Sequence, residues 1–156
     1  MSSPVPFKPV IAGSAASGPP AATPRNVPPR GGPANPSAEA LRQHFGAAIK
    51  RVDVVWGETS VVVDRARLVD IVSWLSDDPA QRYDLLADVT AVEYRDRELP
   101  LEVVYQLWSL DHRRALRVKI ALAKDQPLAV DSVVDLWQGA NWLEREVWDM
   151  FGVTFR

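Results

Sequence analysis

Apolar residues recur every three or four positions in two stretches of the first half of the chain, and this spacing predicts amphipathic helices. The first helix is expected over residues 38–50 with Ser37 as its N-cap, because a serine hydroxyl can accept a hydrogen bond from a free backbone N–H. The second is expected over residues 65–76 and ends before Pro79. Their predicted core positions are Leu41, Phe45 and Ile49, then Leu68, Ile71, Val72 and Leu75.

Alternating or β-branched runs between and after these helices predict strands. Residues 51–56 and 60–63 form an expected hairpin, and residues 101–110 and 115–122 form a second one over a charged turn. Residues 83–94 are expected to be a strand as well, and residues 127–130 a loop. The resulting order, α-β-β-α-β-β-β-α, favours an α+β fold with two layers, in which helices pack on one face of a mixed sheet.

Asp88 lies within the apolar strand predicted over residues 83–94, where strict alternation places it on the same side as Leu86 and Thr90. A carboxylate in such a strand either makes a specific hydrogen bond or ion pair, or caps a bend at a strand end. The sequence leaves these two interpretations open.

Near the C-terminus, residues 141–155 combine the signals of one short helix and its end. Asn141 is the expected N-cap and Glu144 takes the N3 position of a capping box. Gly152 is the expected left-handed residue after the last turn. The predicted apolar stripe consists of Leu143, Val147, Met150 and Phe151.

The polar side of this helix supplies the candidate functional residues. One arginine lies among three carboxylates, and two tryptophans stand beside them, a composition typical of buried interface anchors. Three interpretations remain open: a solvated surface, a lock on the domain's own sheet, or a contact with a basic patch on a partner. The candidate residues are Trp142, Glu144, Arg145, Glu146, Trp148 and Asp149.

Composition narrows the possible functions. The chain has 156 residues, 47% hydrophobic and 24% charged, with a formal net charge of -2, which gives no basic surface for nucleic acid. Cysteine is absent, so no thiolate can hold an iron–sulfur cluster or act as a nucleophile. The two histidines, His44 and His112, have no ligand-like spacing to the acidic residues. We therefore expect no catalytic, cofactor-binding or metal-binding residues in this chain.

Residues 1–38 differ in composition from the rest. Ten of the 13 prolines lie between Pro4 and Pro36, and no acidic residue precedes Glu39. A segment of this kind buries too little apolar surface to offset the entropy of ordering, so we expect a disordered tail before a domain over residues 39–156. It is either dispensable or a tether that orders on a neighbouring subunit.

Several stretches resemble one known family. The C-terminal stretch Trp-Leu-Glu-Arg-Glu-Val-Trp-Asp-Met-Phe-Gly-Val-Thr-Phe (residues 142–155) looks like the signature of the "30 kDa", or C-type, subunit of respiratory complex I. Three further motifs of that family occur in the family's order at residues 84–94, 103–107 and 136–142. The resemblance covers residues 41–155 and implies the same two-layer fold.

The resemblance also implies a function. The C-type subunit is a non-redox, structural part of the peripheral arm of a proton-translocating NADH:quinone oxidoreductase, where it packs against the D-type (49 kDa-like) subunit near iron–sulfur subunits. NADH, FMN, iron–sulfur clusters and quinone would belong to the assembled complex and none to this chain. A peripheral location on the cytoplasmic side of a bacterial inner membrane follows, with membrane contact only through the complex.

Two alternatives remain open at this stage: the homologous subunit of a membrane-bound nickel–iron hydrogenase or formate hydrogenlyase, and a standalone protein-interaction domain. The sequence also departs from the family in one respect. Members usually continue after the position of Phe155 with a Gly-His-Pro-Asp-Leu-Arg-Arg segment, whereas this sequence ends at Arg156, as a fragment or a shortened member would.

Overall fold

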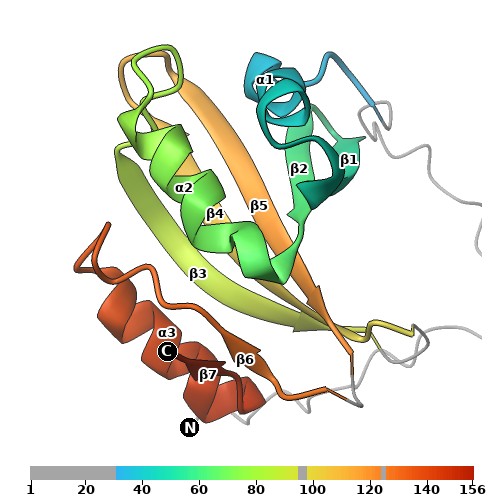
Figure 1. Cartoon of the computed structure of the whole chain (residues 1–156), viewed down its shortest axis with the longest axis vertical. Coiled ribbons are helices and arrows are strands. Elements are labelled where there is room, and N and C mark those ends of the chain that lie inside the picture. Colours follow the sequence, from blue (N-terminus) through green and yellow to red (C-terminus); the bar gives the residue numbers. More distant parts are fainter. Residues whose placement is uncertain (1–30, 95–97, 124–125) are drawn as a thin grey trace, which may run out of the picture.

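A computed structural model of the chain describes residues 31–94, 98–123 and 126–156. Its centre is a five-stranded sheet in the order β1-β2-β5-β4-β3 (Figure 1). Neighbouring strands are antiparallel except for β2 and β5, which run parallel. The strands are β1 (Ile49–Val55), β2 (Glu58–Val63), β3 (Leu85–Glu93), β4 (Leu101–Ser109) and β5 (Arg114–Leu122).

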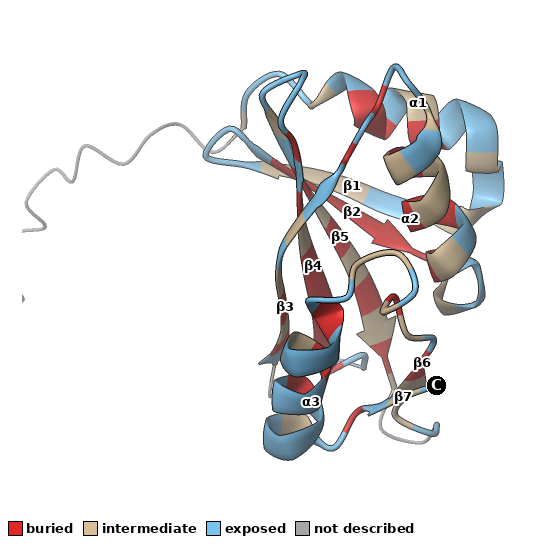
Figure 2. Cartoon of the chain, turned by 90° about the vertical axis from the view of Figure 1, so that its left-hand side faces the viewer, coloured by how far each residue is buried: buried red, intermediate tan, exposed pale blue. Residues whose placement is uncertain are grey.

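Helices α1 (Pro36–Phe45) and α2 (Leu68–Asp77) cover one face of this sheet, each joined to a short 3-10 turn, η1 (Gly46–Ala48) and η2 (Arg65–Arg67). Between the two layers lies one continuous apolar core, visible in Figure 2 as buried positions on the facing sides of strands and helices. Core residues include Leu41, Ile71, Leu75, Val61, Tyr105, Val118 and Ile120. The predicted α+β class with helices on a mixed sheet is confirmed.

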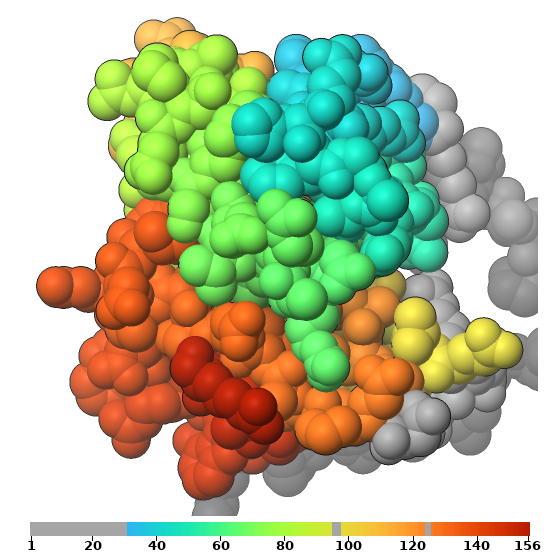
Figure 3. All heavy atoms as spheres, viewed as in Figure 1, coloured from blue at the N-terminus to red at the C-terminus, as the bar shows by residue number. Residues whose placement is uncertain are grey.

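The third helix, α3 (Ala140–Phe151), packs beside the edge strand β3. The sequence did not predict two short strands, β6 (Ala129–Val130), which precedes α3 in the chain, and β7 (Thr154–Phe155), which follows it. These two strands pair with each other in a small parallel sheet. The expected loop at residues 127–130 was therefore partly wrong. Figure 3 shows this C-terminal region, coloured orange to red, occupying the lower part of the face seen in Figure 1. Within the described residues, no helix is both long enough and apolar enough to cross a bilayer.

The start of the first helix differs from the prediction. Asn35, not Ser37, is the N-cap: its side-chain oxygen accepts from the backbone N–H of Ser37 at 2.9 Å. Ser37 lies inside the helix, fully buried, and its hydroxyl is 3.0 Å from the Tyr83 hydroxyl. The helix ends at Phe45 because the chain turns at Gly46, where φ is +52°. Most of the predicted tail, residues 1–30, lies outside the described residues, whereas its predicted boundary after residue 38 falls within α1 (Pro36–Phe45).

A β-bulge in β3 corrects the predicted alternation of that strand. The pairing register with β4 shifts between Leu86 and Asp88, so that one extra residue is accommodated there. Leu86 consequently packs against the core together with Val89 and Ala91, whereas strict alternation placed Leu86 on the opposite side. Asp88, directly after the bulge, is half-buried on the face that no helix covers.

Candidate protein-interaction surface

The first turn of α3 is held by backbone groups. The N–H of Ala140 donates to the carbonyl of Trp137 at 2.9 Å, and that of Asn141 to the carbonyl of Gln138 at 3.3 Å. The residue before the helix is Gly139, which provides no side-chain cap. The prediction of Asn141 as N-cap was therefore wrong, because the preceding turn already satisfies these donors. The predicted end at Gly152 is confirmed: its φ is +72°, and its N–H donates to the carbonyl of Trp148 at 2.9 Å.

Glu144 points inward and is 5% exposed. One carboxylate oxygen accepts from the Ser132 hydroxyl at 2.7 Å and the other from the backbone N–H of Val133 at 2.8 Å. This places Glu144 as an internal contact between α3 and the segment that follows β6. Burial, together with the negative charges of Glu144 and Asp131, raises the pKa of the Tyr105 hydroxyl in the adjoining core.

The other five candidate residues face outward. Trp142 is 73% exposed and Trp148 is 56% exposed. The guanidinium carbon of Arg145 lies 5.2 Å from the centre of the Trp142 ring, a cation–π arrangement. Glu146 and Asp149 are exposed on the same side of the helix. The structure thus separates Glu144 from the residues with which the sequence grouped it.

Met150 adds a third large apolar side chain to this outward surface. It is 68% exposed, so its predicted place in the core stripe was wrong. Leu143, Val147 and Phe151 do pack against the core, and the buried Ala140 completes that side of the helix. We call the outward set the α3 surface: Trp142, Arg145, Glu146, Trp148, Asp149 and Met150.

A groove of about 450 Å³ runs along one flank of the α3 surface, between the helix and β7. Asn141, Arg145 and Trp148 line it from the helix, and Phe155 lines it from the strand. Exposed apolar groups rimmed by charges are typical of protein-interaction sites. The region is also acidic, since residues 127–156 contain five carboxylate side chains and two cations, Arg145 and Arg156.

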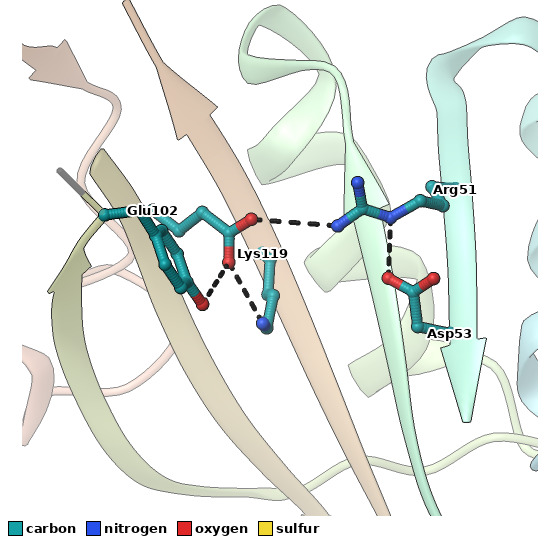
Figure 4. Close-up of polar contacts among 5 residues, drawn as sticks. Arg51, Asp53, Glu102 and Lys119 are labelled. Atoms are coloured by element: carbon teal, nitrogen blue, oxygen red, sulfur yellow. Dashed lines mark hydrogen bonds and ion pairs between the residues drawn. The ribbon is translucent and has the colours of Figure 1, made fainter. Parts of the chain in front are cut away.

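The helix-free face of the sheet carries a second polar cluster, which the sequence did not single out (Figure 4). Glu102 is 3% exposed there, and its carboxylate accepts from Lys119 Nζ at 3.0 Å and from the Tyr94 hydroxyl at 3.3 Å. Arg51 reaches the same carboxylate at 3.8 Å and Asp53 at 2.6 Å. The only sequence signal was the alternation of Arg117 and Lys119 with apolar residues, which predicted a wet or partner-facing side.

No metal centre is formed within the part of the chain that the structure describes, because it contains no group of three or more His, Cys, Asp or Glu side chains arranged to hold an ion. The side chains on α3 are of the kinds that bind other proteins: exposed tryptophans, an arginine stacked on one of them, and carboxylates. One buried glutamate on the same helix supports them.

Comparison with known families decides the classification. Residues 61–156 match the family model of the respiratory-chain NADH dehydrogenase 30 kDa subunit. The chain belongs to this family. The 30 kDa subunit family thus covers the central strands, α2, α3 and the candidate surface, as the motifs at residues 84–94 and 142–155 predicted.

Curated relatives agree with this membership. The C-type subunit of the NADH-quinone oxidoreductase of Rhodospirillum rubrum is 39% identical over 107 residues, which are 69% of this chain and 49% of that protein. Its counterpart in Geobacter sulfurreducens is 40% identical over 116 residues, or 74% of this chain and 70% of that one. The chain therefore spans about half the length of the first of these relatives.

Solved structures share the fold of this family member. A trypsin-resistant fragment (1–134) of Nqo5 superposes with a TM-score of 0.65 at 26% identity, covering 76% of this chain and 93% of the fragment. A chain of the membrane-bound sulfane sulfur reductase, an archaeal respiratory membrane complex, gives a TM-score of 0.61 at 23% identity over 78% of this chain and 71% of that one. The second likeness concerns the fold alone.

Proposed function

We propose that this chain is a non-redox subunit of the peripheral arm of a proton-translocating NADH:quinone oxidoreductase, and that it docks on the D-type subunit through the α3 surface. In this role it supports electron transfer from NADH to quinone by holding its neighbours in place. NADH, FMN, iron–sulfur clusters and quinone are bound by other subunits, and contact with the cytoplasmic side of a bacterial inner membrane is made through the complex.

The exposed tryptophans of α3 carry this proposal. Trp142 and Trp148 leave large apolar areas in contact with water on a family member whose relatives are named as subunits of one complex. Trp and Arg are enriched at the centres of interfaces, where burial of a large ring contributes most to affinity. Glu146 and Asp149 beside them favour a basic partner surface.

Glu144 supports the same proposal from inside. Its two hydrogen bonds fix α3 against the segment after β6, so the outward residues are presented on a rigid helix. A preorganised surface loses less conformational entropy on binding than a mobile one. The names of the relatives favour a quinone oxidoreductase over a hydrogenase, because both curated relatives described above are named as subunits of an NADH-quinone oxidoreductase.

Co-purification tests this assignment. The chain is tagged at its N-terminus, membranes are solubilised gently, and the recovered subunits are identified together with NADH:quinone activity. We expect D-type and iron–sulfur subunits. The double variant Glu146→Ala/Asp149→Ala should lower their recovery, because truncating one side of a desolvated charge pair costs about 2 to 5 kcal/mol.

Asp77→Ala, an exposed acid at the end of α2, is the matched control and should leave recovery unchanged. Recovery with a nickel–iron hydrogenase large subunit instead would assign the chain to that complex. Recovery of D-type subunits at the same level from the double variant and from Trp148→Ala would show that docking uses another surface.

A further inference from the structure

The helix-free face of the sheet has a hollow of about 420 Å³ near the turn that joins β4 to β5. Residues of β2, β3, β4 and β5 line it, so the hollow crosses the sheet from β2 to the edge strand β3. Its lining residues are distinct from those of the α3 surface and of the Glu102 cluster. The charged and aromatic side chains in the hollow are Glu58, Asp88, Trp108 and Arg117.

The β-bulge in β3 brings a carboxylate to this hollow. Leu86 packs against the core, and strict alternation would place Asp88 on that same side. The extra residue at Ala87 places Asp88 on the opposite face instead, directly across from Gln106 of β4. Trp108 is the next residue of β4 on that face, and diagonal neighbours of this kind are typically about 7 to 8 Å apart. The bulge therefore places a carboxylate beside an indole ring.

The Asp88 carboxylate has no cation beside it among the described residues. It is half-buried, and its side chain makes no hydrogen bond or ion pair with any residue that the structure describes. Arg117 is already engaged, because its Nη2 lies 2.7 Å from a carboxylate oxygen of Glu58. Its Nε also donates to the side-chain oxygen of Gln106 at 2.9 Å, in the amide orientation that satisfies both groups. Two carboxylates and one guanidinium leave one negative charge in the hollow unbalanced.

Trp108 gives the hollow an exposed aromatic wall. Its side chain is 44% exposed, and Leu85, directly opposite on β3, is 43% exposed. The face of an indole ring attracts cations electrostatically. Arginine suits a ring beside a carboxylate better than lysine does, because its planar guanidinium stacks on the ring while its N–H groups donate to the carboxylate. Ala87 and Ala115, which also line the hollow, have small side chains that leave room for such a group.

We propose that this hollow is a second docking site, and that its occupant is an arginine side chain of a partner protein, stacked on Trp108 and paired with Asp88. Charge complementarity decides the occupant, since a neutral or acidic segment would leave the half-buried Asp88 carboxylate unpaired. A stacked arginine in a partly closed hollow is also typical of residues that dominate the affinity of an interface. The site is separate from the α3 surface and does not depend on a D-type subunit.

A titration followed by NMR tests the site on the isolated full chain. The probe is N-acetyl-arginine amide, added to ¹⁵N-labelled protein, and it should shift the indole N–H signal of Trp108. Asp88→Asn should weaken the apparent affinity about threefold or more, because the ion pair is lost. Asp53→Asn is the matched control: it removes a carboxylate on the same face that is already paired with Arg51, and it should leave the affinity unchanged.

N-acetyl-lysine amide carries the same charge as the arginine probe and controls for a general effect of salt. It should shift the Trp108 signal less than the arginine probe does at equal concentration. Two results would overturn the proposal: equal responses to the two probes, or an affinity for the arginine probe that is the same in Asp88→Asn as in the parent.

Photo-crosslinking tests the identity of the occupant in gently solubilised membranes. Leu85→p-benzoylphenylalanine places the reactive group opposite Trp108. The adduct should contain a peptide of another protein with an arginine close to the crosslinked residue, and Asp88→Asn should lower its yield about threefold or more. An adduct with a peptide of this same chain, or a yield that does not depend on Asp88, would overturn the proposal. Neither result bears on whether the α3 surface docks on a D-type subunit.

Discussion

At the scale of single residues, the main result is the division of one acidic motif into an inward and an outward part. Glu144 and Glu146 are two positions apart, and helical geometry alone places them on different sides. The sequence could identify the motif as important, but it could not assign Glu144 inward, because its partners Ser132 and Val133 belong to a segment whose path the sequence leaves open.

Removing the Glu144 carboxylate should therefore cost stability. We expect Glu144→Ala to lower the free energy of unfolding by about 2 to 3 kcal/mol, because the Val133 N–H and the Ser132 hydroxyl lose their acceptor. Glu144→Gln keeps one acceptor oxygen and should cost about 1 kcal/mol. Urea denaturation measures both.

The matched control is Glu146→Ala, which removes an exposed carboxylate and should stay within about 0.5 kcal/mol of the parent. Equal losses for Glu144→Ala and Glu146→Ala would contradict the inward placement of Glu144.

Asp64 predicts a dependence of stability on pH. Its hydrogen bonds from Lys50 Nζ, at 3.0 Å, and from the Ala66 N–H hold the pKa of the Asp64 carboxyl below its ordinary value of 3.8. A carboxyl whose pKa is lower in the folded state stabilises the fold above about pH 4 and loses that contribution as the pH falls through the folded-state value.

The corresponding variant is Asp64→Asn, which can still accept from Ala66 but cannot pair with Lys50. It should be slightly less stable than the parent at about pH 7, and the difference should shrink towards about pH 3. The effect is small because the Asp64 side chain is 40% exposed and solvent screens the pair. A gap that widens in acid, measured by urea denaturation, would contradict the assignment.

At the scale of elements, periodicity predicted what local sequence determines. The three long helices and the two antiparallel hairpins occur in the predicted regions of the chain, because the spacing of an amphipathic stripe depends on consecutive residues. The predicted end of the first helix at residue 50 was wrong, since α1 ends at Phe45 and Ile49 begins β1. The bulge at Ala87 and the two-residue strands β6 and β7 were missed. Each depends on a partner strand elsewhere in the chain, and a strand of two residues has too few positions to show alternation.

The β1–β2 hairpin contains an unusual turn. Trp56 and Gly57 are its two central residues, and both have positive φ, +55° and +81°, as in a type I′ turn. Asparagine is common at the first position, whereas a tryptophan there is strained. Trp56→Asn should raise the free energy of unfolding by about 1 kcal/mol.

Gly57, in the same turn, provides a variant with the opposite expected effect on stability. Gly57→Ala should lower stability, although nothing lies within 4 Å of a β-carbon at that position, because its φ is unfavourable for alanine. Thermal unfolding of the two variants should therefore shift in opposite directions. A destabilised Trp56→Asn would mean that the exposed ring makes contacts worth more than the strain.

At the scale of the whole molecule, the two faces of the five-stranded sheet are covered in different ways. Helices cover one side, while the other carries the polar Glu102 cluster (Figure 4) together with Val62 and Val104, which are 6% and 3% exposed. Family motifs predicted the fold and the family, but they could not reveal this cluster, because its members come from three strands and no local pattern joins them.

Loss of the Glu102 carboxylate should destabilise the helix-free face of the sheet, including strands that Glu102 does not belong to. Glu102→Ala leaves Lys119, 16% exposed, without this carboxylate, and we expect a loss of about 2 kcal/mol in the free energy of unfolding. Faster amide hydrogen exchange in β1 should accompany it, because Arg51 would no longer connect β1 to β4. Glu98→Ala, an exposed neighbour, should change neither quantity.

The parallel pairing of β2 with β5 has a consequence for synthesis. β1 and β2 close their hairpin early, but the second edge of β2 has no strand to pair with until Arg117, Val118 and Lys119 have left the ribosome. This temporarily unpaired edge of β2 contains Val61, Val62 and Val63, three consecutive β-branched residues. Unpaired apolar edges recruit other strands. Self-association is therefore a hazard of the nascent chain, and it ends when β5 is inserted.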